Sequence, residues 1–196
     1  RHHKKQFHIA ETEKYAHVTY FFNGGVEEPF SGEERLLIRS PQIAGYDEKP
    51  AMSAPAITRA VVERLHLAKD DFILVNYANS DMVGHTGNLT AAIEAVEVLD
   101  VCIGKVVAAA LKVSATVIIT ADHGNVEEML NSETGSIDKE HSTNPVPLWL
   151  VTPDNRLSNP APVLTDTTPQ GVLADVAPTI LGIMGIKQPE TMTGLD

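Results

Sequence analysis

The sequence predicts an α/β fold in which helices cover both faces of a mostly parallel sheet. Short apolar runs alternate along the chain with longer segments of helical periodicity. The runs at 72–77 and 117–120 carry apolar residues at successive positions, as strands buried on both faces do. Polar segments rich in glycine follow both runs, and ligands collect at the carboxyl ends of strands in such sheets. We therefore expect a three-layer α/β/α architecture with its site at that edge.

The individual elements follow from periodicity and from turn signals. Ser53 is expected to cap a helix that has Pro55 in its first turn, and Asn88 is expected to cap a long helix that ends near residue 113. Pro178 is expected to kink the last helix. In chain order, the predicted elements are a strand at 7–9, a helix at 11–22, a strand at 34–39, a helix from 53, strands at 72–77, 117–120 and 146–151, and helices at 88–113 and 172–184.

The long helix carries a stripe of apolar residues that we expect to be buried, with acidic residues on its other faces. The stripe consists of Leu89, Ala92, Ile93, Val96, Leu99, Ile103, Val106 and Ala110.

Composition narrows the class of protein. The 196 residues suit one domain or slightly more, and 43% hydrophobic residues can form a core. The net charge is −11 and there is no basic tract, so nucleic acid and anionic membranes are not expected partners. No apolar run is long enough to span a membrane. The single cysteine, Cys102, reads as a core residue and indicates a reducing compartment, so we expect a cytoplasmic protein.

Five residues can ligate a divalent metal, and all of them lie in polar loop-like segments: Asp81, His85, Asp122, His123 and His141. Mixed carboxylate and imidazole ligands suit Mn, Zn or Fe. The plainer alternative is that the segments are turns and the histidines are ordinary hydrogen-bonding residues. Three such segments in one chain favour metal binding, and two of them directly follow a predicted strand.

The ligands divide into one larger and one smaller group. Asp81 and His85 are four residues apart, so one helical turn can bring them to one ion, and His141 can complete a three-residue site with an open position. Asp122 and His123 are adjacent and would hold a second ion with too few ligands. No nucleophile stands out, because Ser80 and Thr86 read as structural hydroxyls. Lys14 has the pattern of an ordinary solvated lysine on a helix, with phosphate binding as the alternative.

Three segments together resemble the cofactor-independent (2,3-bisphosphoglycerate-independent) phosphoglycerate mutases. They are IAETEKYAHVT at 9–19 with FFNGG at 21–25, NYANSDMVGHTG at 76–87, and TADHGN at 120–125. The similarity runs from about residue 6 to the end of the chain, and the motifs are long and specific.

The resemblance implies an alkaline-phosphatase-like fold and two divalent ions, Mn first, with Zn, Mg or Co as alternatives. It assigns Asp81, His85 and His141 to one ion, Asp122 and His123 to the other, and Lys14 to the substrate phosphate. It also implies interconversion of 3-phosphoglycerate and 2-phosphoglycerate, a step of glycolysis and gluconeogenesis, through a phosphoserine intermediate.

The chain lacks two parts that the family pattern includes. An earlier segment of these enzymes supplies the nucleophilic serine and further ligands, and an inserted domain supplies most substrate-binding arginines. We expect residues 1–196 to be the later segment alone, inactive without the N-terminal segment of the same protein, which would be its partner. Two alternatives stay open: another phosphatase or phosphopentomutase of the alkaline phosphatase superfamily, or a non-catalytic metal-binding fragment.

Overall fold

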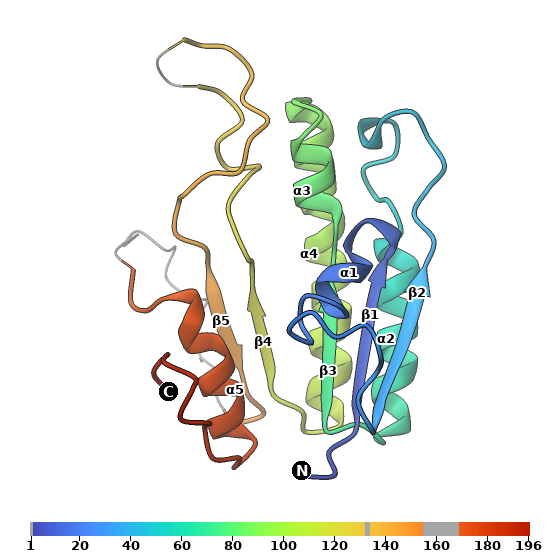
Figure 1. Cartoon of the computed structure of the whole chain (residues 1–196). Coiled ribbons are helices and arrows are strands. Elements are labelled where there is room, and N and C mark those ends of the chain that lie inside the picture. Colours follow the sequence, from blue (N-terminus) through green and yellow to red (C-terminus); the bar gives the residue numbers. More distant parts are fainter. Residues whose placement is uncertain (1, 132–133, 155–168) are drawn as a thin grey trace.

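Three parallel strands form the larger of two sheets in the computed structural model, which describes residues 2–131, 134–154 and 169–196 (Figure 1). The central strand is β1 (Gln6–Glu11), with β2 (Glu33–Ile38) on one side and β3 (Phe72–Asn76) on the other. Glu11 pairs in register with Ile38 on β2. Five of the six residues of β1 are buried, because strands and helices surround it on every side.

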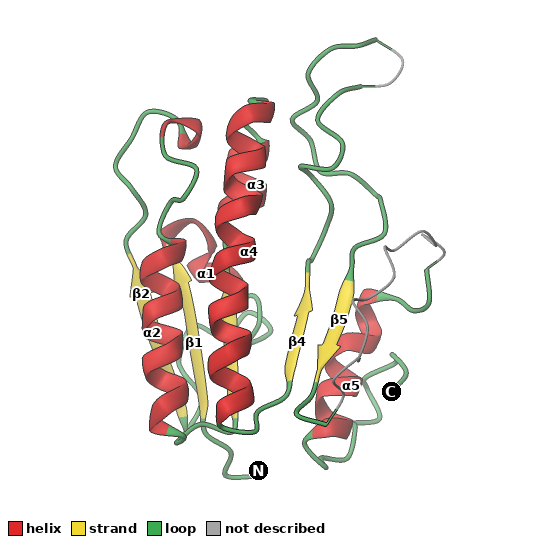
Figure 2. Cartoon of the chain, turned by 180° about the vertical axis from the view of Figure 1, so that it is seen from behind, coloured by secondary structure: helices red, strands yellow, loops and turns green. Residues whose placement is uncertain are grey.

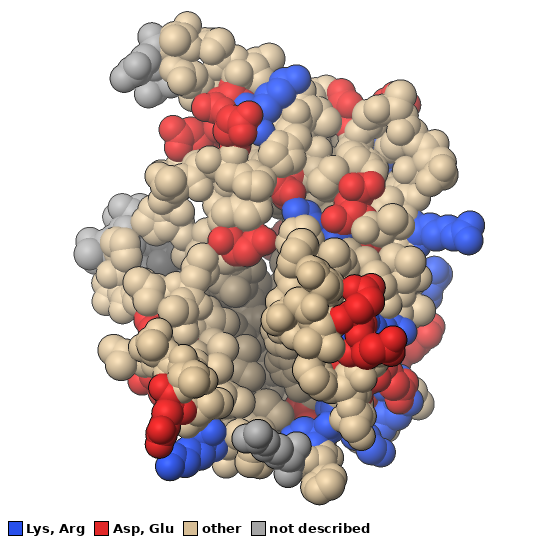
Figure 3. Space-filling view, in the orientation of Figure 1, with Lys and Arg blue, Asp and Glu red and all other residues tan. Residues whose placement is uncertain are grey.

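The second sheet is an antiparallel pair, β4 (Val117–Thr120) and β5 (Leu148–Val151). β4 points the same way as β1 to β3, and β5 runs back against it (Figure 2). β3 is the edge of one sheet and β4 the edge of the other. The space-filling surface is hollowed between the two sheet regions (Figure 3).

Helices lie on both sides of the strands. The long helices α2 (Ala54–Leu67) and α4 (Leu89–Lys112) cover one face, while α1 (Tyr15–Val18) and α5 (Val176–Ile183) lie on the other (Figures 1 and 2). Between α2 and the sheet is a core of Phe7, Ile9, Ile57 and Val61. The α/β class with a parallel sheet, predicted from the sequence, is confirmed.

The expected helix at 11–22 is much shorter in the structure. β1 continues through Glu11, whose buried carboxylate accepts hydrogen bonds from Ser40 Oγ at 2.9 Å and Ser53 N at 3.3 Å. These bonds keep Glu11 extended. Burial raises the pKa of this carboxyl, and the hydrogen bonds from Ser40 and Ser53 lower it in part. A 3₁₀ turn at Thr12–Lys14 then leads into one turn of α1.

Two of the predicted helix signals act differently. Ser53 lies at the N-cap position of α2 and Pro55 in its first turn, as predicted, but the Ser53 hydroxyl donates to the carbonyl of Arg39 at 2.8 Å and makes no capping bond to the helix. Pro178 does not kink α5. The helix begins later than expected, after a 3₁₀ turn at Leu173–Asp175, so Pro178 falls in its first turn, where a backbone N–H is not needed. Asn88 does cap α4, accepting from Ala91 N at 3.2 Å.

The predicted buried stripe of α4 holds at Ala92 but is wrong at its other N-terminal positions. Leu89, Ile93 and Val96 are 55%, 53% and 45% exposed. The packed face consists of Ala91, Ala92 and Ala95, whose small side chains let α3 (Asn79–Gly84) come close. Periodicity locates apolar positions, but it does not tell which of them have a neighbour.

Smaller elements complete the description. A 3₁₀ turn at Tyr46–Glu48 precedes α2. Among the described residues, no helix is both long and apolar enough to cross a membrane. Residues 155–168, between β5 and the 3₁₀ turn at Leu173–Asp175, fall outside the described residues.

Candidate metal centre

The first pair of candidate ligands comes from α3, which begins three residues after β3 ends. The sequence predicted a loop or a single helical turn here, and the structure has the turn. Asp81 lies in its first turn and His85 is its C-cap, so the two side chains lie four residues apart on one face. His85 Nε2 is 3.0 Å from Asp81 Oδ1.

The second group comes from the loops that join β4 to β5. His123 follows β4, and His141 precedes β5. An antiparallel bridge between Gly124 and Ser142 holds these loops side by side, with Ser142 N donating to the Gly124 carbonyl at 3.0 Å. The rings of His123 and His141 stack with centroids 3.6 Å apart.

The two groups converge on one carboxylate oxygen. His141 Nε2 lies 3.0 Å from Asp81 Oδ1, and His123 Nε2 lies 3.9 Å from the same atom. The Nε2 atoms of His85 and His141 are 3.1 Å apart. Asp81, His123 and His141 each offer a ligand atom within 4.8 Å of the others. The ligand atoms of four residues therefore face one small volume.

The imidazoles have the orientation that ligands of a metal need. Nδ1 of His85 contacts the carbonyl of Lys139, and Nδ1 of His123 lies 3.1 Å from the carbonyl of Gly124. A carbonyl only accepts, so in the neutral imidazole Nδ1 donates to it and Nε2 keeps its lone pair. Both Nε2 atoms point toward Asp81. Three imidazole nitrogens and a carboxylate fit a divalent transition metal.

Lys14 lies beside the same carboxylate. Its Nζ donates to Asp81 Oδ2, and both side chains are largely buried, at 8% and 13% exposed. Burial alone would raise the pKa of Asp81, but the hydrogen bond and charge of Lys14, with a smaller effect of His85, lower it to about 2. Asp81 is therefore ionised at neutral pH, as a metal ligand must be.

Asp122 stands somewhat apart. Its side chain is 58% exposed, and Oδ1 lies 3.5 Å from His123 Nε2. The sequence predicted two groups, with His123 beside Asp122. In the structure His123 also reaches toward Asp81, so that Asp81, His123 and His141 form one group, with His85 beside Asp81 and His141 and with Asp122 at its edge.

Two residues that received no role from the sequence also belong to this region. Asn125 is buried, and its Nδ2 donates to Asp81 Oδ1 at 3.0 Å. His17, at the end of α1, feels the same charges: burial and Lys14 lower its pKa, while Asp122 and Asp81 raise it in part. The position of Asn125 directly after the Asp-His-Gly run was a signal for it, whereas His17 is brought near by the fold alone.

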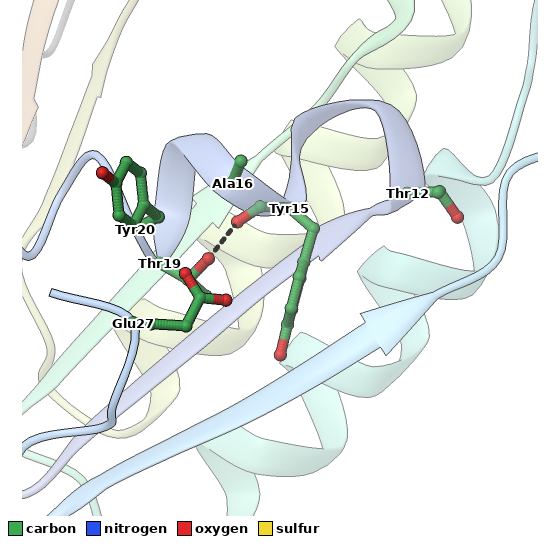
Figure 4. A pocket seen from close by; sticks show the side chains of 6 residues that line it. All are labelled: Thr12, Tyr15, Ala16, Thr19, Tyr20 and Glu27. Carbon is green, nitrogen blue, oxygen red and sulfur yellow. Dashed lines mark hydrogen bonds between the residues drawn. The ribbon is translucent and has the colours of Figure 1, made fainter. Parts of the chain in front are cut away.

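Two pockets differ in their relation to the cluster. A pocket of about 210 Å³ is lined by His141, Ser142 and acidic residues of the same loop. A larger one, of about 440 Å³, lies beside α1 and is lined by Thr12, Tyr15, Ala16, Thr19, Tyr20 and Glu27 (Figure 4). Its walls contain none of the predicted site residues, so its size does not mark it as the functional site.

Comparison with known proteins agrees with the ligand chemistry. Residues 1–188 match the model of the metalloenzyme superfamily, and the chain belongs to this family.

More specific similarity is to one group of enzymes. The chain is 54% identical over 190 residues to the 2,3-bisphosphoglycerate-independent phosphoglycerate mutase of Thermomicrobium roseum, with 97% of this chain and 36% of the relative covered. It is 53% identical over 194 residues to the mutase of the same name from Pseudomonas aeruginosa PAO1, with 99% and 36% covered. The resemblance predicted from the motifs is confirmed, and the chain spans about a third of the length of these curated relatives.

A solved structure gives the same result in three dimensions. The crystal structure of phosphoglycerate mutase from Leishmania mexicana at low cobalt concentration superposes with a TM-score of 0.82 at 30% sequence identity. The match covers 98% of this chain and 37% of that one. The fold described above therefore corresponds to about a third of the solved mutase structure.

Proposed function

We propose that this chain is the metal-binding part of a cofactor-independent phosphoglycerate mutase, which interconverts 3-phosphoglycerate and 2-phosphoglycerate. The observation that carries the proposal is the convergence of Asp81, His85, His123 and His141, in a chain that is 54% identical to a mutase of that name. We place residues 1–196 in one metal-binding domain, with the substrate-binding domain elsewhere in the enzyme. The buried, free Cys102 supports a reducing compartment such as the cytoplasm.

We assign the residues the roles that the family resemblance implies. Asp81, His85 and His141 would hold one ion, and Asp122 and His123 a second, with Mn as the first choice and Zn, Mg or Co as alternatives. Bound metal would polarise phosphoryl oxygens and lower the pKa of an attacking hydroxyl. Lys14 places a buried positive charge at the cluster, and we assign it to the substrate phosphate. The nucleophilic serine is assigned to another part of the enzyme.

The proposed partner is the part of the mutase that lies outside this sequence. The relatives are about three times as long, and the surface is hollowed between the edges of β3 and β4 (Figure 3). Strand edges present unpaired N–H and C=O groups that favour pairing with another strand. Nearby on β5, Leu148, Trp149 and Leu150 are 53%, 45% and 45% exposed, as expected of surface that another segment covers.

Metal content and thermal melting, with and without Mn²⁺, test the metal site. We expect about one Mn²⁺ per chain and a raised melting temperature, since an ion at 100 times its Kd stabilises by about 2.7 kcal/mol. Asp81→Ala should lose both effects, whereas Asp100→Ala, at an exposed position of α4, should keep them. No bound metal and no stabilisation would contradict the proposed site.

Reconstitution tests the assignment to a mutase. This chain is co-expressed with the preceding two thirds of the Thermomicrobium roseum enzyme, and the pair is assayed with 3-phosphoglycerate and with ribose phosphates. We expect a stable complex with mutase turnover, and no turnover by the chain alone. Turnover of ribose phosphates instead would favour a phosphopentomutase, and full mutase activity of the isolated chain would contradict the division of roles.

A further inference from the structure

The loops that carry His123 and His141 are joined close to the metal centre by a carboxylate that is not itself among the predicted ligands. This carboxylate belongs to Glu127. Its Oε2 accepts a hydrogen bond from the backbone N–H of Asn125 at 2.7 Å. Its Oε1 accepts from the Ser142 hydroxyl and from Asn144 Nδ2, the latter at 3.2 Å. One side chain therefore accepts hydrogen bonds from both loops, next to the bridge between Gly124 and Ser142.

The same hydrogen bonds lead directly to the ligands. Ser142 follows His141 in the chain, so fixing Ser142 fixes the backbone from which the imidazole of His141 projects. Asn125 lies two residues after His123, and its side chain donates to Asp81 Oδ1 at 3.0 Å. Glu127 is thus one hydrogen bond away from groups that position three of the ligands.

Gly124 shows how closely this link is built. A Cβ atom at Gly124 would lie 2.1 Å from Glu127 Oε1 and 2.2 Å from Ser142 Oγ. Both distances are far inside van der Waals contact, so the hydrogen bond between Glu127 and Ser142 occupies the space that any other residue would need. The absence of a side chain at Gly124 therefore leaves the space that the Glu127 carboxylate occupies.

We propose that Glu127 is a positioning residue of the metal centre. Its carboxylate fixes the loop that carries His141 against the loop that carries His123, so that the two imidazoles reach Asp81 together. The proposal rests on the metal-binding function proposed above. Partners that orient metal ligands in this way change metal affinity by about 10- to 100-fold when they are removed.

The first test compares the Mn²⁺ affinity of this chain with that of Glu127→Gln, measured by calorimetry. Glutamine turns one acceptor into a donor that faces another donor, so we expect Kd to rise about 10- to 100-fold. Glu140→Gln is the matched control. This control removes the same charge from the residue next to His141. The structure describes no hydrogen bond of the Glu140 side chain, so Glu140→Gln should change Kd by less than about threefold.

A double-mutant cycle shows whether Glu127 acts through His141. His141→Ala should weaken Mn²⁺ binding by removing a ligand. Adding Glu127→Gln to His141→Ala should raise Kd by less than about a further twofold, since the effects of residues that act together are not additive. A general loss of fold would instead give additive losses. Ser142→Ala removes a single donor to Glu127 and, with the loop otherwise unchanged, should raise Kd severalfold.

The outcomes separate the two proposals. If the unmodified chain binds no Mn²⁺, both the metal site and the role of Glu127 are overturned. If it binds Mn²⁺ and Glu127→Gln binds equally well, only the role of Glu127 is overturned. The same holds if Glu127→Gln raises Kd by its full factor again in the His141→Ala background. Melting of the metal-free variants shows whether each one is folded.

Discussion

The strands β1 and β5 both carry apolar residues, yet these residues have opposite environments. In β1, Ile9 and Ala10 are fully buried, while in β5 Leu148 and Trp149 are 53% and 45% exposed. β1 lies between two parallel strands with α2 packed on its face, whereas β5 pairs with β4 alone in the described part of the chain. Burial of an apolar strand is therefore decided by its neighbours, which are distant in sequence.

The candidate metal centre lies across the boundary between these two regions. Asp81 and His85 belong to the region of β1, and His123 and His141 to the region of β4 and β5. The first region supplies ligands from a helix end packed on a core, and the second supplies them from loops. We infer that a bound ion would fix the second region to the first.

The largest expected difference between the regions concerns stability. Ile9→Ala removes a fully buried side chain and should lower the free energy of unfolding by about 2–5 kcal/mol. Leu150→Ala, at a position 45% exposed, should cost about 1 kcal/mol. Urea denaturation of the metal-free chain measures both. Equal losses would break the comparison.

A glycine substitution in the second region tests how tightly its loops are fitted. Gly124→Ala places a Cβ against the ends of the Glu127 and Ser142 side chains, which must move apart and give up their hydrogen bond, at a cost of about 0.5–1.5 kcal/mol. Because the clash separates the two loops, Mn²⁺ binding should weaken as well. Thermal melting and calorimetry measure the two effects, and a variant unchanged in both would show that the loops are not held as described.

The first region should also respond to pH. Burial lowers the pKa of His8 from 6.5, with the charge of Glu33 opposing this effect in part. A lowered folded-state pKa means that the unfolded chain binds the proton more readily, so stability is full above pH 6.5 and falls as pH decreases below it. The slope for one proton is at most about 1.4 kcal/mol per pH unit. Denaturation between pH 5.5 and 7.5 should show stability falling below pH 6.5, and His8→Gln should reduce this fall by the contribution of one proton, leaving that of His17, whose pKa burial also lowers.

The smallest effect is expected on an exposed helix surface. A Cβ at Gly104, within α4, would meet no atom within 4 Å. Gly104→Ala should therefore stabilise the chain by about 0.5–1 kcal/mol, opposite in sign to Gly124→Ala. A loss of stability at Gly104 would indicate that this surface of α4 is packed in solution.

Local signals in the sequence were read correctly where the structure depends on neighbouring residues alone. β4 has the predicted bounds, and Asn88 caps α4 as expected. The fold class and the family resemblance are confirmed as well, because hydrophobic periodicity and long motifs can be recognised in the sequence without knowing which residues are in contact. Asp81 and His85 lie on one helical turn, which their spacing allowed.

Features that depend on residues distant in sequence could not be predicted from local signals. Glu11 remains extended because Ser40 and Ser53 bond to its carboxylate from other parts of the chain. The exposed half of the α4 stripe and the exposed face of β5 reflect where neighbours are placed. The ion pair of Lys14 with Asp81, and the link made by Glu127, join residues that the fold alone brings together. Propensity and spacing carry no information about such partners.

Amide hydrogen exchange with and without Mn²⁺ tests most directly whether the ligand cluster joins the two regions. Mn²⁺ should slow exchange in β4, β5 and the loops at 121–131 and 134–147, and it should change little in β1 and β2, which are held by their own core. Saturating Mn²⁺ that leaves exchange in β4, β5 and these loops unchanged would contradict a metal centre built across the boundary.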